Sequence, residues 1–536
     1  MSALDWAVLT TYFAAIVVLS ISIGRRQKDG TDYFLGGRSL GRGLVALSLA
    51  ANQVSAISLV GAPAFVAMSA GGGLVWLQYE FAVPLAMIAV MFLLAPLFRR
   101  QAGATVFEYA ERRFGLTARL VLSALFLVSR GLAAGVVLYA SALVLAVALG
   151  IPVIATLAIL GSIAVAYTTI GGITADVASD AIQLVILWLG TAAAVIVALQ
   201  LVGGIEGALA SVQPERLATI DLAHHGLGDG RDYALWPMLI GGFFLYLSYY
   251  GCDQSQAQRL ISTPTLRAAG DSLAINGLVR FPIVLTYCAL GVLLAAFLAQ
   301  NPSWIADKGI TNPNYLVPTF IVSFLPAGVV GLVMAGIFAA TMSSIDSALN
   351  SLAAVTMTDF VARFRPSAGE NRKRFLHWSR LTTLFWGLFC VAGGYFIARS
   401  PRTVIELVNM IGSAFYGPIL AVFMAGALLR RVNGTGALFG LAAGLATNVS
   451  LWLFAPGVSW LWWNPIGFGV ALATARIASF IQPVPSAEQL EWTLRSLKAN
   501  REEHPVWWLD YRTWILVVAF FAILIISVVI GLTASR

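Results

Sequence analysis

Apolar segments long enough to cross a membrane recur along almost the whole chain. A transmembrane helix needs about 20 mostly apolar residues to cross the ~30 Å hydrocarbon core of a bilayer, and segments of that length follow one another from Trp6 to Ile530. Only 11% of the 536 residues are charged, against about a quarter in a typical soluble domain, and the mean hydropathy is +0.84. The sequence therefore predicts an all-α polytopic membrane protein.

Counting these segments gives about fourteen expected transmembrane helices. The first lacks the basic start and the small-residue cleavage site of a signal peptide, so we expect it to remain as a helix. The expected helices lie near residues 5–24, 43–69, 74–98, 120–149, 152–170, 180–203, 235–252, 274–300, 326–361, 381–399, 403–429, 436–455, 459–480 and 513–533.

Basic residues are grouped in the connections between apolar segments, and this grouping predicts the topology. The formal net charge is +8, but the clusters lie beside membrane segments, which argues against a phosphate-binding face and against nucleic acid as a partner. If the N-terminus is outside, the clusters share one side, which the positive-inside rule makes cytoplasmic. They lie at 25–42, 99–119, 259–267, 363–380 and 430–431. An even number of crossings then puts both termini outside the cell membrane.

Other sequence features argue against an enzyme or a disulfide-stabilised protein. The zinc-protease pattern HExxH is absent, and the four histidines fall in expected loops. The three cysteines are odd in number and lie in or beside expected helices, so no disulfide framework is predicted. The segment 482–511 is amphipathic, and we expect a cytoplasmic helix on the membrane surface, with partner binding as the alternative. No obligate protein partner is implied, and membrane lipid is the expected surrounding.

Two expected helices carry polar residues at a depth where lipid would not tolerate them. The second reads SLAANQVSAISLVGAP and the ninth reads GLVMAGIFAATMSSIDSALNS. Polar or broken helices at mid-membrane depth occur only where they line a cavity or are buried in protein. A pair of them in separate halves of a chain is typical of a transporter site between two repeats. We therefore expect discontinuous or polar helices around a central solute site.

A cluster of oxygen-bearing residues on the ninth expected helix indicates a cation site. At ~100° per residue the cluster falls within a wedge of about 160°, and it consists of Ala340, Ser343, Ser344, Asp346 and Ser347. Hydroxyl, carbonyl and carboxylate oxygens suit a hard cation such as sodium. The alternative is that the serines only pack and hydrogen-bond back to the helix. Asp346 favours the ion, because an ionisable group at that depth is costly and usually paired or functional.

Four further polar residues in the expected helices leave alternatives open. Asp180, at the start of the sixth, can cap that helix and can also meet an ion near the cytoplasmic mouth. Arg130 lies about a third of the way along the fourth, where it can pair with Asp180, with Glu80 or with a substrate carboxylate. Gln78 and Glu80 on the third are about 200° apart, so both cannot face one site.

Seven motifs, taken in order, resemble those of the sodium:solute symporter family over nearly the whole chain. They are DYFLGGRSL, SLAANQVSAISLVGAP, FEYAERRFG, YTTIGGITADVASDAIQ, YYGCDQSQAQR, AATMSSIDSALNS and YGPILAVFMAGALLRR. The resemblance implies a leucine-transporter-type fold with two inverted five-helix repeats. It implies one membrane transport domain over 1–536, with repeats at 43–203 and 235–430 and peripheral helices at 1–24 and 436–533.

The resemblance also implies two sets of sodium ligands. The family's principal site corresponds to the carbonyls of Ala51 and Val54 with Ala340, Ser343 and Ser344. Some members bind a second sodium ion, which here corresponds to Asp180, Ser343, Asp346 and Ser347. This chain has Asp346 where such members have Ser. A carboxylate there would strengthen a cation site unless Arg130 pairs with it.

The substrate is the part that the resemblance implies least directly. The matching positions are Asn52, Gln53, Ser55, Ser58, Gln78 or Glu80, and Tyr249 as an inner aromatic gate. Glu80 resembles the acid that contacts hydroxyls in sugar-carrying members, whereas VSAISLVGAP resembles the branch that carries monocarboxylates, vitamins and other anions. Arg130 lies about one turn from a carboxylate-binding Arg of sialic-acid members.

We therefore expect inward sodium flux to drive uptake of a small organic anion, such as a monocarboxylate, by alternating access. A sugar or polyol symporter is the alternative, and a solute sensor is a more remote one.

Overall fold

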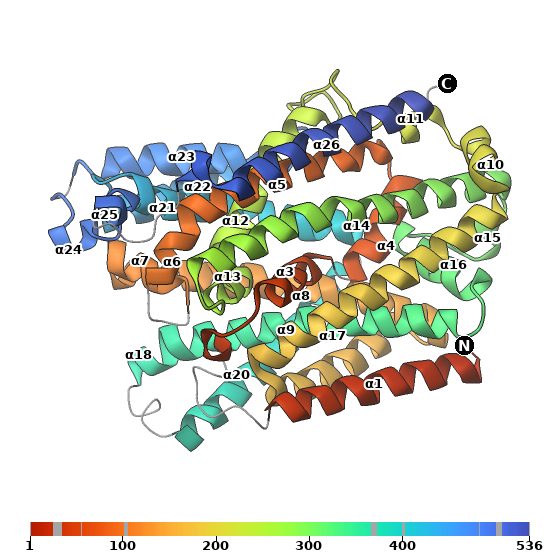
Figure 1. The fold of residues 1–536 in the computed structure, drawn as a ribbon, viewed down its shortest axis with the longest axis horizontal. Helices are drawn as coiled ribbons and strands as arrows, with labels where there is room; N and C mark the ends of the chain where they lie inside the picture. Colours follow the sequence, from red (N-terminus) through yellow and green to blue (C-terminus); the bar gives the residue numbers. More distant parts are fainter. Residues whose placement is uncertain are drawn as a thin grey trace.

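The structure is a computed structural model in which nearly all of the described chain is helical. It describes residues 2–24, 35–54, 56–100, 105–365, 372–398, 402–481, 483–499 and 506–534. No β-strand occurs within these ranges, where a single isolated bridge joins Leu227 to Val458. The long helices run roughly lengthwise as one bundle (Figure 1), which confirms the predicted all-α fold.

The first part of the chain forms ten α-helices among the described residues. They are α1 (Ala3–Gly24), α3 (Arg42–Gln53), α4 (Ala56–Met68), α5 (Ala82–Ala89), α6 (Ala95–Arg100), α7 (Phe107–Phe114), α8 (Leu116–Leu149), α9 (Val153–Leu201), α10 (Gly204–Ser211) and α11 (Pro214–Leu217). A 3-10 segment, Leu74–Phe81, leads into α5, and a π segment, Val90–Leu94, joins α5 to α6. These four pieces form one apolar span, Leu74–Arg100.

The middle of the chain supplies the second set of central helices. They are α12 (Gly242–Cys252), α13 (Gln254–Ile261), α14 (Leu266–Gln300), α15 (Trp304–Asp307), α16 (Leu316–Phe324), α17 (Val329–Val355), α18 (Ala362–Phe364), α20 (Arg372–Ile397) and α21 (Val404–Leu428). A π segment, Thr356–Val361, joins α17 to α18. Helices α3 and α4 pack against α14, α17 and helices of the first part, including α9 against α3 and α8 against α4. Both sets therefore meet at the centre.

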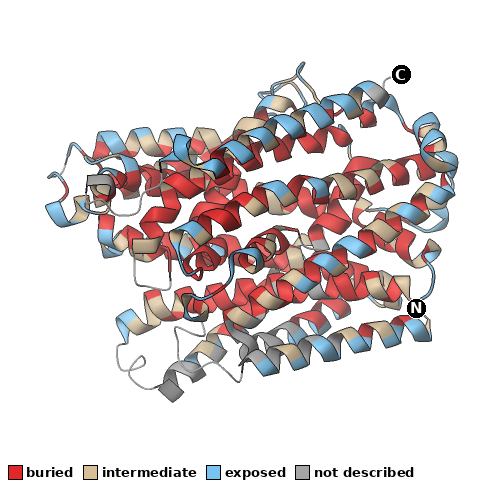
Figure 2. Cartoon of the chain, in the orientation of Figure 1, coloured by how far each residue is buried: buried red, intermediate tan, exposed pale blue. Residues whose placement is uncertain are grey.

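The end of the chain forms peripheral helices. They are α22 (Gly434–Phe454), α23 (Trp463–Ala478), α24 (Ala487–Leu490), α25 (Leu494–Ala499) and α26 (Tyr511–Ala534). Figure 2 shows buried residues concentrated in the middle of the bundle and exposed residues along the outer faces of α1 and α26. Helix α26 is strongly apolar, yet only 22% of its most apolar 18-residue window is buried. An apolar but uncovered helix of this kind fits a lipid-facing position.

Eight helices among the described residues are long and apolar enough to cross a membrane, and the bent pair α3–α4 makes a ninth. The expected number of fourteen is therefore not confirmed by length and composition. Part of the difference lies in α9, where two expected helices, 152–170 and 180–203, form one helix of 49 residues. At ~1.5 Å per residue a straight helix of that length would measure about 74 Å, more than twice the hydrocarbon thickness. Among the residues of α9 whose side chains are described, Asp176–Leu201 qualifies as a span, and Val153–Ile163 is a shorter apolar stretch.

Within the described ranges, two helices are broken near the centre of the bundle. α3 and α4 meet at a bend of 50°, where Val54 leaves the helical region with φ −91° and ψ 84°. The second break separates α12 from α13 at Asp253, whose carboxylate caps α13 by accepting a hydrogen bond from the Ser255 N–H. The ninth expected helix is not broken at its polar cluster, because Asp346 lies well inside the continuous helix α17. Its polar residues mark a buried helix face, and the second break lies elsewhere.

The segment 482–511 differs from the single membrane-surface helix that its pattern predicts. Its described part contains two short helices, α24 and α25, and the first begins with a capping box of Ser486 and Gln489. Between them Trp492 contacts the protein itself, because the Arg100 guanidinium lies 4.9 Å from its ring centroid and the Tyr109 hydroxyl donates to its carbonyl at 3.2 Å. The segment therefore folds back on α6 and α7.

Candidate substrate and ion site

A cavity lies at the break between α3 and α4. The centre of a water-sized sphere can occupy about 90 Å³ of it, and one water needs at least ~10 to 15 Å³ by the same measure. The cavity is therefore large enough for a small solute. Its polar and aromatic lining residues include Asn52, Gln53, Ser58, Trp76, Tyr79, Arg130, Tyr249, Arg280, Tyr287, Ser344, Asn409 and Tyr416.

Most of the predicted substrate residues line this cavity. Asn52, Gln53, Ser58, Arg130 and Tyr249 all do so. Ser55 lies outside the described residues, and so does the side chain of Ser343. The helix break explains this convergence, because it ends the α3 backbone hydrogen bonds and turns the polar side chains beside it toward the neighbouring helices.

Arg130 reaches the cavity from the middle of α8 and has loosely placed partners. One terminal nitrogen, Nη2, donates to the Asn52 side-chain oxygen at 3.3 Å, and Nη1 lies 4.0 Å from an Asp253 carboxylate oxygen. Its Nε is buried and has no hydrogen-bond partner among the described residues. The ion pair is therefore with Asp253 of the second broken helix, a partner that sequence reasoning did not consider. The 4.0 Å separation leaves donor capacity for a ligand.

Arg280, on α14, is a second guanidinium at this cavity, and sequence reasoning missed it. Its Nε and Nη2 donate to the two oxygens of Glu80 at 3.0 and 3.3 Å, and the Tyr246 hydroxyl donates to the same carboxylate at 3.1 Å. Glu80 itself is fully buried and does not line the cavity. An ionisable residue six positions into the expected helix 274–300 was the available signal, since such residues are rare and usually functional.

Gln78 also lies away from the cavity. Its amide nitrogen donates to the Val75 carbonyl at 3.1 Å, and its oxygen accepts a hydrogen bond from the Asp221 N–H at 3.0 Å. These contacts attach the 3-10 segment to the loop before α12. Gln78 and Glu80 therefore both support the structure around the site in this conformation. Glu80 influences the cavity through Arg280, the cavity-lining residue with which it forms an ion pair.

The charges that line the cavity are positive. Arg130 and Arg280 both contribute to its wall, whereas no carboxylate does so among the described residues. The carboxylates that balance them, Asp253 and Glu80, lie behind the wall. Aliphatic and aromatic side chains line the remaining surface. The Tyr249 hydroxyl donates to the Asn52 carbonyl at 3.4 Å, and the Tyr249 ring lies 6.1 Å from that of Tyr416. The lining therefore suits an anion with an apolar body.

The break also offers oxygen atoms to a cation. The last regular backbone hydrogen bond of α3 runs from the Val54 N–H to the Ala50 carbonyl at 2.8 Å, and a helix end leaves its final carbonyls without helical partners. Ser344 of α17 is one of the residues at the cavity, and its buried hydroxyl has no hydrogen-bond partner within the described chain. Ala51, Val54 and Ala340 are buried as well. Unsatisfied hard oxygens of this kind fit sodium.

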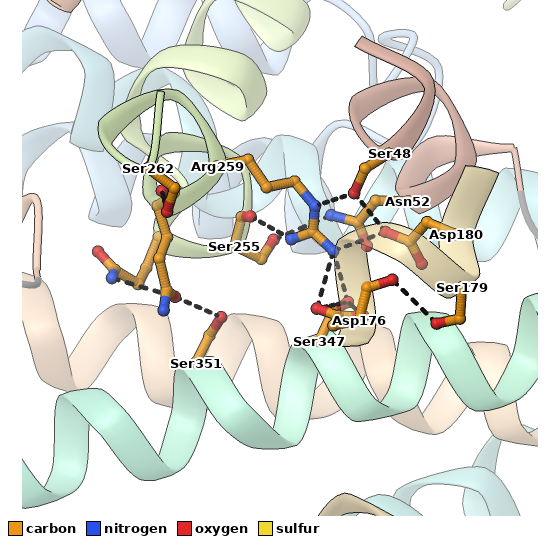
Figure 3. A network of polar contacts seen from close by, with 12 residues as sticks. Ser48, Asn52, Asp176, Ser179, Asp180, Ser255, Arg259, Ser262, Ser347 and Ser351 are labelled. Atoms are coloured by element: carbon orange, nitrogen blue, oxygen red, sulfur yellow. Dashed lines mark hydrogen bonds and ion pairs between the residues drawn. The ribbon is translucent and has the colours of Figure 1, made fainter. Parts of the chain in front are cut away.

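A second polar cluster lies deeper, around Arg259 of α13 (Figure 3). Its guanidinium donates to Asp176 at 3.1 Å, to Asp180 at 3.0 Å and to the Ser347 hydroxyl at 2.6 Å. The Ser48 hydroxyl bonds to Asp180, and Ser347 also donates to Asp176 at 2.7 Å. Sequence reasoning found Asp180 and Ser347 but assigned Arg259 to a cytoplasmic loop and missed Asp176. The break at residue 253 is what turns α13, and with it Arg259, into the protein.

This Arg259 cluster carries an uneven charge. Two carboxylates share one guanidinium, and the Asp180 Oδ1 is buried with no hydrogen-bond partner among the residues that the structure describes. Asp346 is buried on α17, the helix that also carries Ser347. If Asp176 and Asp180 are both ionised, the cluster has one excess negative charge, which a monovalent cation would balance.

Asn52 connects the Arg259 cluster to the cavity. Its side-chain oxygen accepts from Arg130, and its nitrogen donates to the Ser255 hydroxyl at 3.3 Å. Ser255 donates to Asp253 at 2.5 Å, and its carbonyl accepts from Arg259 at 2.6 Å. A continuous set of polar contacts therefore runs from the cavity, through both helix breaks, to the deeper carboxylates.

Comparison with known proteins identifies the family. The model of the sodium:solute symporter family matches residues 33–444. The chain belongs to this family. It is 30% identical over 453 residues to sodium-coupled monocarboxylate transporter 1 of Xenopus laevis, covering 84% of this chain and 71% of that one. It is 29% identical over 448 residues to the sodium/sialic acid symporter NanT of Aliivibrio fischeri, covering 83% of this chain and 86% of that one.

Two solved transporter structures superpose on this chain. A sodium-coupled sialic acid symporter in a substrate-bound outward-open state superposes with a TM-score of 0.81 at 24% identity, over 90% of this chain and 99% of that one. A closed nucleobase-cation-symport-1 family transporter superposes with a TM-score of 0.56 at 14% identity, over 87% and 99%. The symporter is therefore a multi-pass membrane protein with a leucine-transporter-type fold.

Proposed function

We propose that this symporter couples inward movement of sodium to uptake of a small organic anion by alternating access. The observation that carries the proposal is the cavity wall at the α3–α4 break, which contains two guanidinium groups and, among the described residues, no carboxylate. A charge-assisted hydrogen bond to a carboxylate is about twice as strong as a neutral one. The monocarboxylate and sialic acid relatives, whose names both refer to acids, support the same substrate class.

The alternative of a sugar substrate depended on Glu80, which does not line the cavity. A sugar carrier would use Glu80 as an acceptor for hydroxyl groups, but that carboxylate is fully buried and already accepts hydrogen bonds from Arg280 and Tyr246. Arg130, whose carboxylate partner lies 4.0 Å away, keeps donor capacity at the cavity. We therefore place the substrate carboxylate at Arg130, beside Asn52 and the ring of Tyr249. The other expected substrate residues belong to the same broken helix as Asn52, and they are Gln53, Ser55 and Ser58.

The principal sodium site in this proposal lies at the same break. Its ligands are the carbonyls of Ala51 and Val54 with Ala340, Ser343 and Ser344. The buried Ser344 hydroxyl without a partner supports it. A second ion would bind near Asp180, Asp346 and Ser347, where the uneven charge around Arg259 supports a further cation. Arg259 occupies the space between Asp180 and Ser347 here, so the second ion requires that guanidinium to shift.

The topology in this proposal is two inverted repeats, 43–203 and 235–430, each opened by a broken helix. The pairs α3–α4 and α12–α13 supply these breaks. α1 begins and α26 ends at the same end of the bundle (Figure 1), and α6, α7, α24 and α25 lie at the other. That second end carries the basic residues Arg99, Arg100, Arg112 and Arg113, so we assign it to the cytoplasm and both termini to the outside.

The decisive experiment is uptake into proteoliposomes that contain the purified protein. Labelled monocarboxylates, sialic acid and glucose are offered under an inward sodium gradient and, in parallel, under an equal potassium gradient. We expect accumulation of at least one carboxylate in sodium alone. Accumulation of glucose with no carboxylate uptake would overturn the substrate class, and equal uptake in potassium would overturn the coupling ion.

A further inference from the structure

A cluster of arginines surrounds the first turns of α14, away from the cavity. Arg267 and Asp271 lie four positions apart on that helix and therefore share one of its faces. Arg42, the first residue of α3, donates to Asp271 at 2.8 Å. Arg512 of α26 donates to Asp271 at 3.3 Å and to the Arg267 carbonyl at 2.8 Å. Arg99 donates to three backbone carbonyls that precede α14. We call these four arginines the Arg267 patch.

Positive charge exceeds negative charge in the Arg267 patch. The two carboxylates that contact it are Asp271 and Asp510, and each has a side chain less than a tenth exposed. The hydrogen bond from Arg512 and the charge of nearby Arg267 lower the pKa of the Asp510 carboxyl. Four arginines with two carboxylates leave two positive charges in excess. Arg42 and Arg267 are both exposed, so this excess reaches the protein surface.

Aromatic side chains place the Arg267 patch at the surface of the membrane. Trp507, Trp508, Tyr511 and Trp514 lie at or just before the start of α26, and each is more than half exposed. Exposed tryptophan and tyrosine at the end of an apolar span lie at the level of the lipid head groups. The Tyr511 hydroxyl donates to Asp271 at 3.4 Å, so the patch lies at the same level.

An anionic phospholipid matches both the charge and the depth of this patch. Guanidinium groups bind phosphate oxygens through strong, directed hydrogen bonds, and basic pockets between transmembrane helices bind lipid head groups. A zwitterionic lipid brings its own cation, which the excess positive charge would repel. Acyl chains also have an apolar surface to contact, because only 22% of the most apolar window of α26 is buried.

We propose that the Arg267 patch binds the phosphate of an anionic phospholipid in the leaflet at this end of the bundle. The exposed Arg42 and Arg267 donate to the phosphate. Arg512 stays with the two carboxylates and fixes the first turn of α14 through the Arg267 carbonyl. The acyl chains lie along α26. This inference does not depend on which solute the cavity holds.

The test compares two lipids with the same acyl chains on purified full-length protein in detergent. Dioleoylphosphatidylglycerol carries a net negative charge and dioleoylphosphatidylcholine does not. Native mass spectrometry at increasing lipid concentration measures binding of each. We expect the wild type to bind phosphatidylglycerol roughly thirtyfold more tightly, because each exposed basic residue contributes about fivefold. Equal binding of the two lipids would overturn the inference.

Free phosphate is the other source of the same chemistry. Inorganic phosphate lacks acyl chains and so gains nothing from the apolar surface of α26. We expect an excess of inorganic phosphate to leave phosphatidylglycerol bound. Displacement of the lipid by inorganic phosphate would make the patch a site for soluble anions and would overturn the lipid assignment.

Two double variants test the exposed arginines. Arg42→Gln with Arg267→Gln removes both exposed charges and leaves Arg512 beside Asp271, so that no buried carboxylate loses its last cation. The preference for phosphatidylglycerol should fall to a few-fold or less. Arg42→Lys with Arg267→Lys keeps both charges and should retain most of the preference. A preference that survives the glutamine pair, or that the lysine pair also loses, would overturn the role of these charges.

A matched control separates this patch from the general charge of the surface. Arg476 of α23 and Arg495 of α25 are also exposed arginines. Arg476→Gln with Arg495→Gln removes the same net charge away from the patch. This pair should keep the wild-type preference for phosphatidylglycerol. A loss equal to that of Arg42→Gln with Arg267→Gln would show that overall charge decides the binding, and the site would be refuted.

Discussion

Arg130 and Arg259 lie at opposite ends of one chain of polar contacts, yet their surroundings differ. Arg259 is only 2% exposed and donates to two carboxylates, two hydroxyls and a carbonyl. Arg130 donates to Asn52, lies near the Tyr249 hydroxyl and has a distant carboxylate, and its Nε has no partner within the described chain. A guanidinium is saturated when protein groups accept hydrogen bonds from all of its nitrogens. The saturated Arg259 balances buried charge, whereas the unsaturated Arg130 is available to a ligand.

The same distinction applies to the spaces beside the two arginines. The cavity at Arg130 admits water-sized spheres, whereas the pocket beside Arg259, Asp176 and Ser347 has no such space. The first therefore has room for a small ligand as it stands. An ion can enter the second only if Arg259 moves. The predictions below test this contrast, beginning with the largest expected effect.

Removing the saturated arginine should damage the fold. Arg259→Gln leaves Asp176 and Asp180 buried without their cation, and breaking a buried pair in this way costs about 3 to 5 kcal/mol. We expect a large fall in Tm or loss of folded protein in detergent, measured by thermal unfolding. Adding Asp176→Asn to Arg259→Gln should recover part of the loss. If Arg259→Gln keeps the wild-type Tm, the structural role of Arg259 is contradicted.

Removing the unsaturated arginine should act mainly on binding. Arg130→Gln should weaken carboxylate binding by about 1.5 to 3 kcal/mol, roughly ten- to 150-fold, because it removes a buried charge-assisted contact. Its Tm should fall less than that of Arg259→Gln. Calorimetry in sodium measures the affinity. A lower Tm with unchanged carboxylate affinity would instead make Arg130 a structural partner of Asp253.

The presence of a second sodium ion near the Arg259 cluster can be tested by the voltage dependence of uptake. One sodium moving with one monoanion carries no net charge, whereas a second sodium makes uptake respond to ~2.3 kcal/mol per 100 mV. With two ions, uptake should rise when the vesicle interior is made negative, and Asp346→Asn should weaken that response. Proteoliposomes under a potassium diffusion potential provide the measurement. Anion uptake that ignores voltage in the wild type would contradict a second ion.

The smallest of these effects concerns the principal sodium site. Ser343→Ala with Ser344→Ala removes two proposed ligand oxygens while the backbone carbonyls remain. If each oxygen contributes about as much as a hydrogen bond, ~1 kcal/mol, the sodium concentration for half-maximal uptake should rise about thirtyfold. The Tm should stay near that of the wild type, because both changes preserve the helix. Unchanged sodium dependence would refute the assignment of this site.

Sequence reasoning located several residues that are anomalous within apolar segments, although it passed over Arg280, and it missed roles that depend on pairing across the fold. Arg130 and Asp180 were visible because ionisable groups are rare in membrane helices. Arg259 sits in YYGCDQSQAQR, a stretch that looks like the polar end of a helix until the break at Asp253 turns it inward. The distinct role of Glu80 depends on Arg280, a partner 200 residues away. No local pattern encodes such a distance.

The bend between α3 and α4 has a thermodynamic consequence. Asn52 and Gln53 line the cavity, while the carbonyls proposed for sodium belong to Ala51 and Val54 of the same short segment. The first ligand that binds to this segment restricts its motion and pays the entropy cost of ordering it. The second ligand then binds to a segment that is already ordered. In the proposed function, each ligand would therefore raise the affinity for the other by the same factor. High sodium outside the cell would then favour solute capture, and low sodium inside would favour its release.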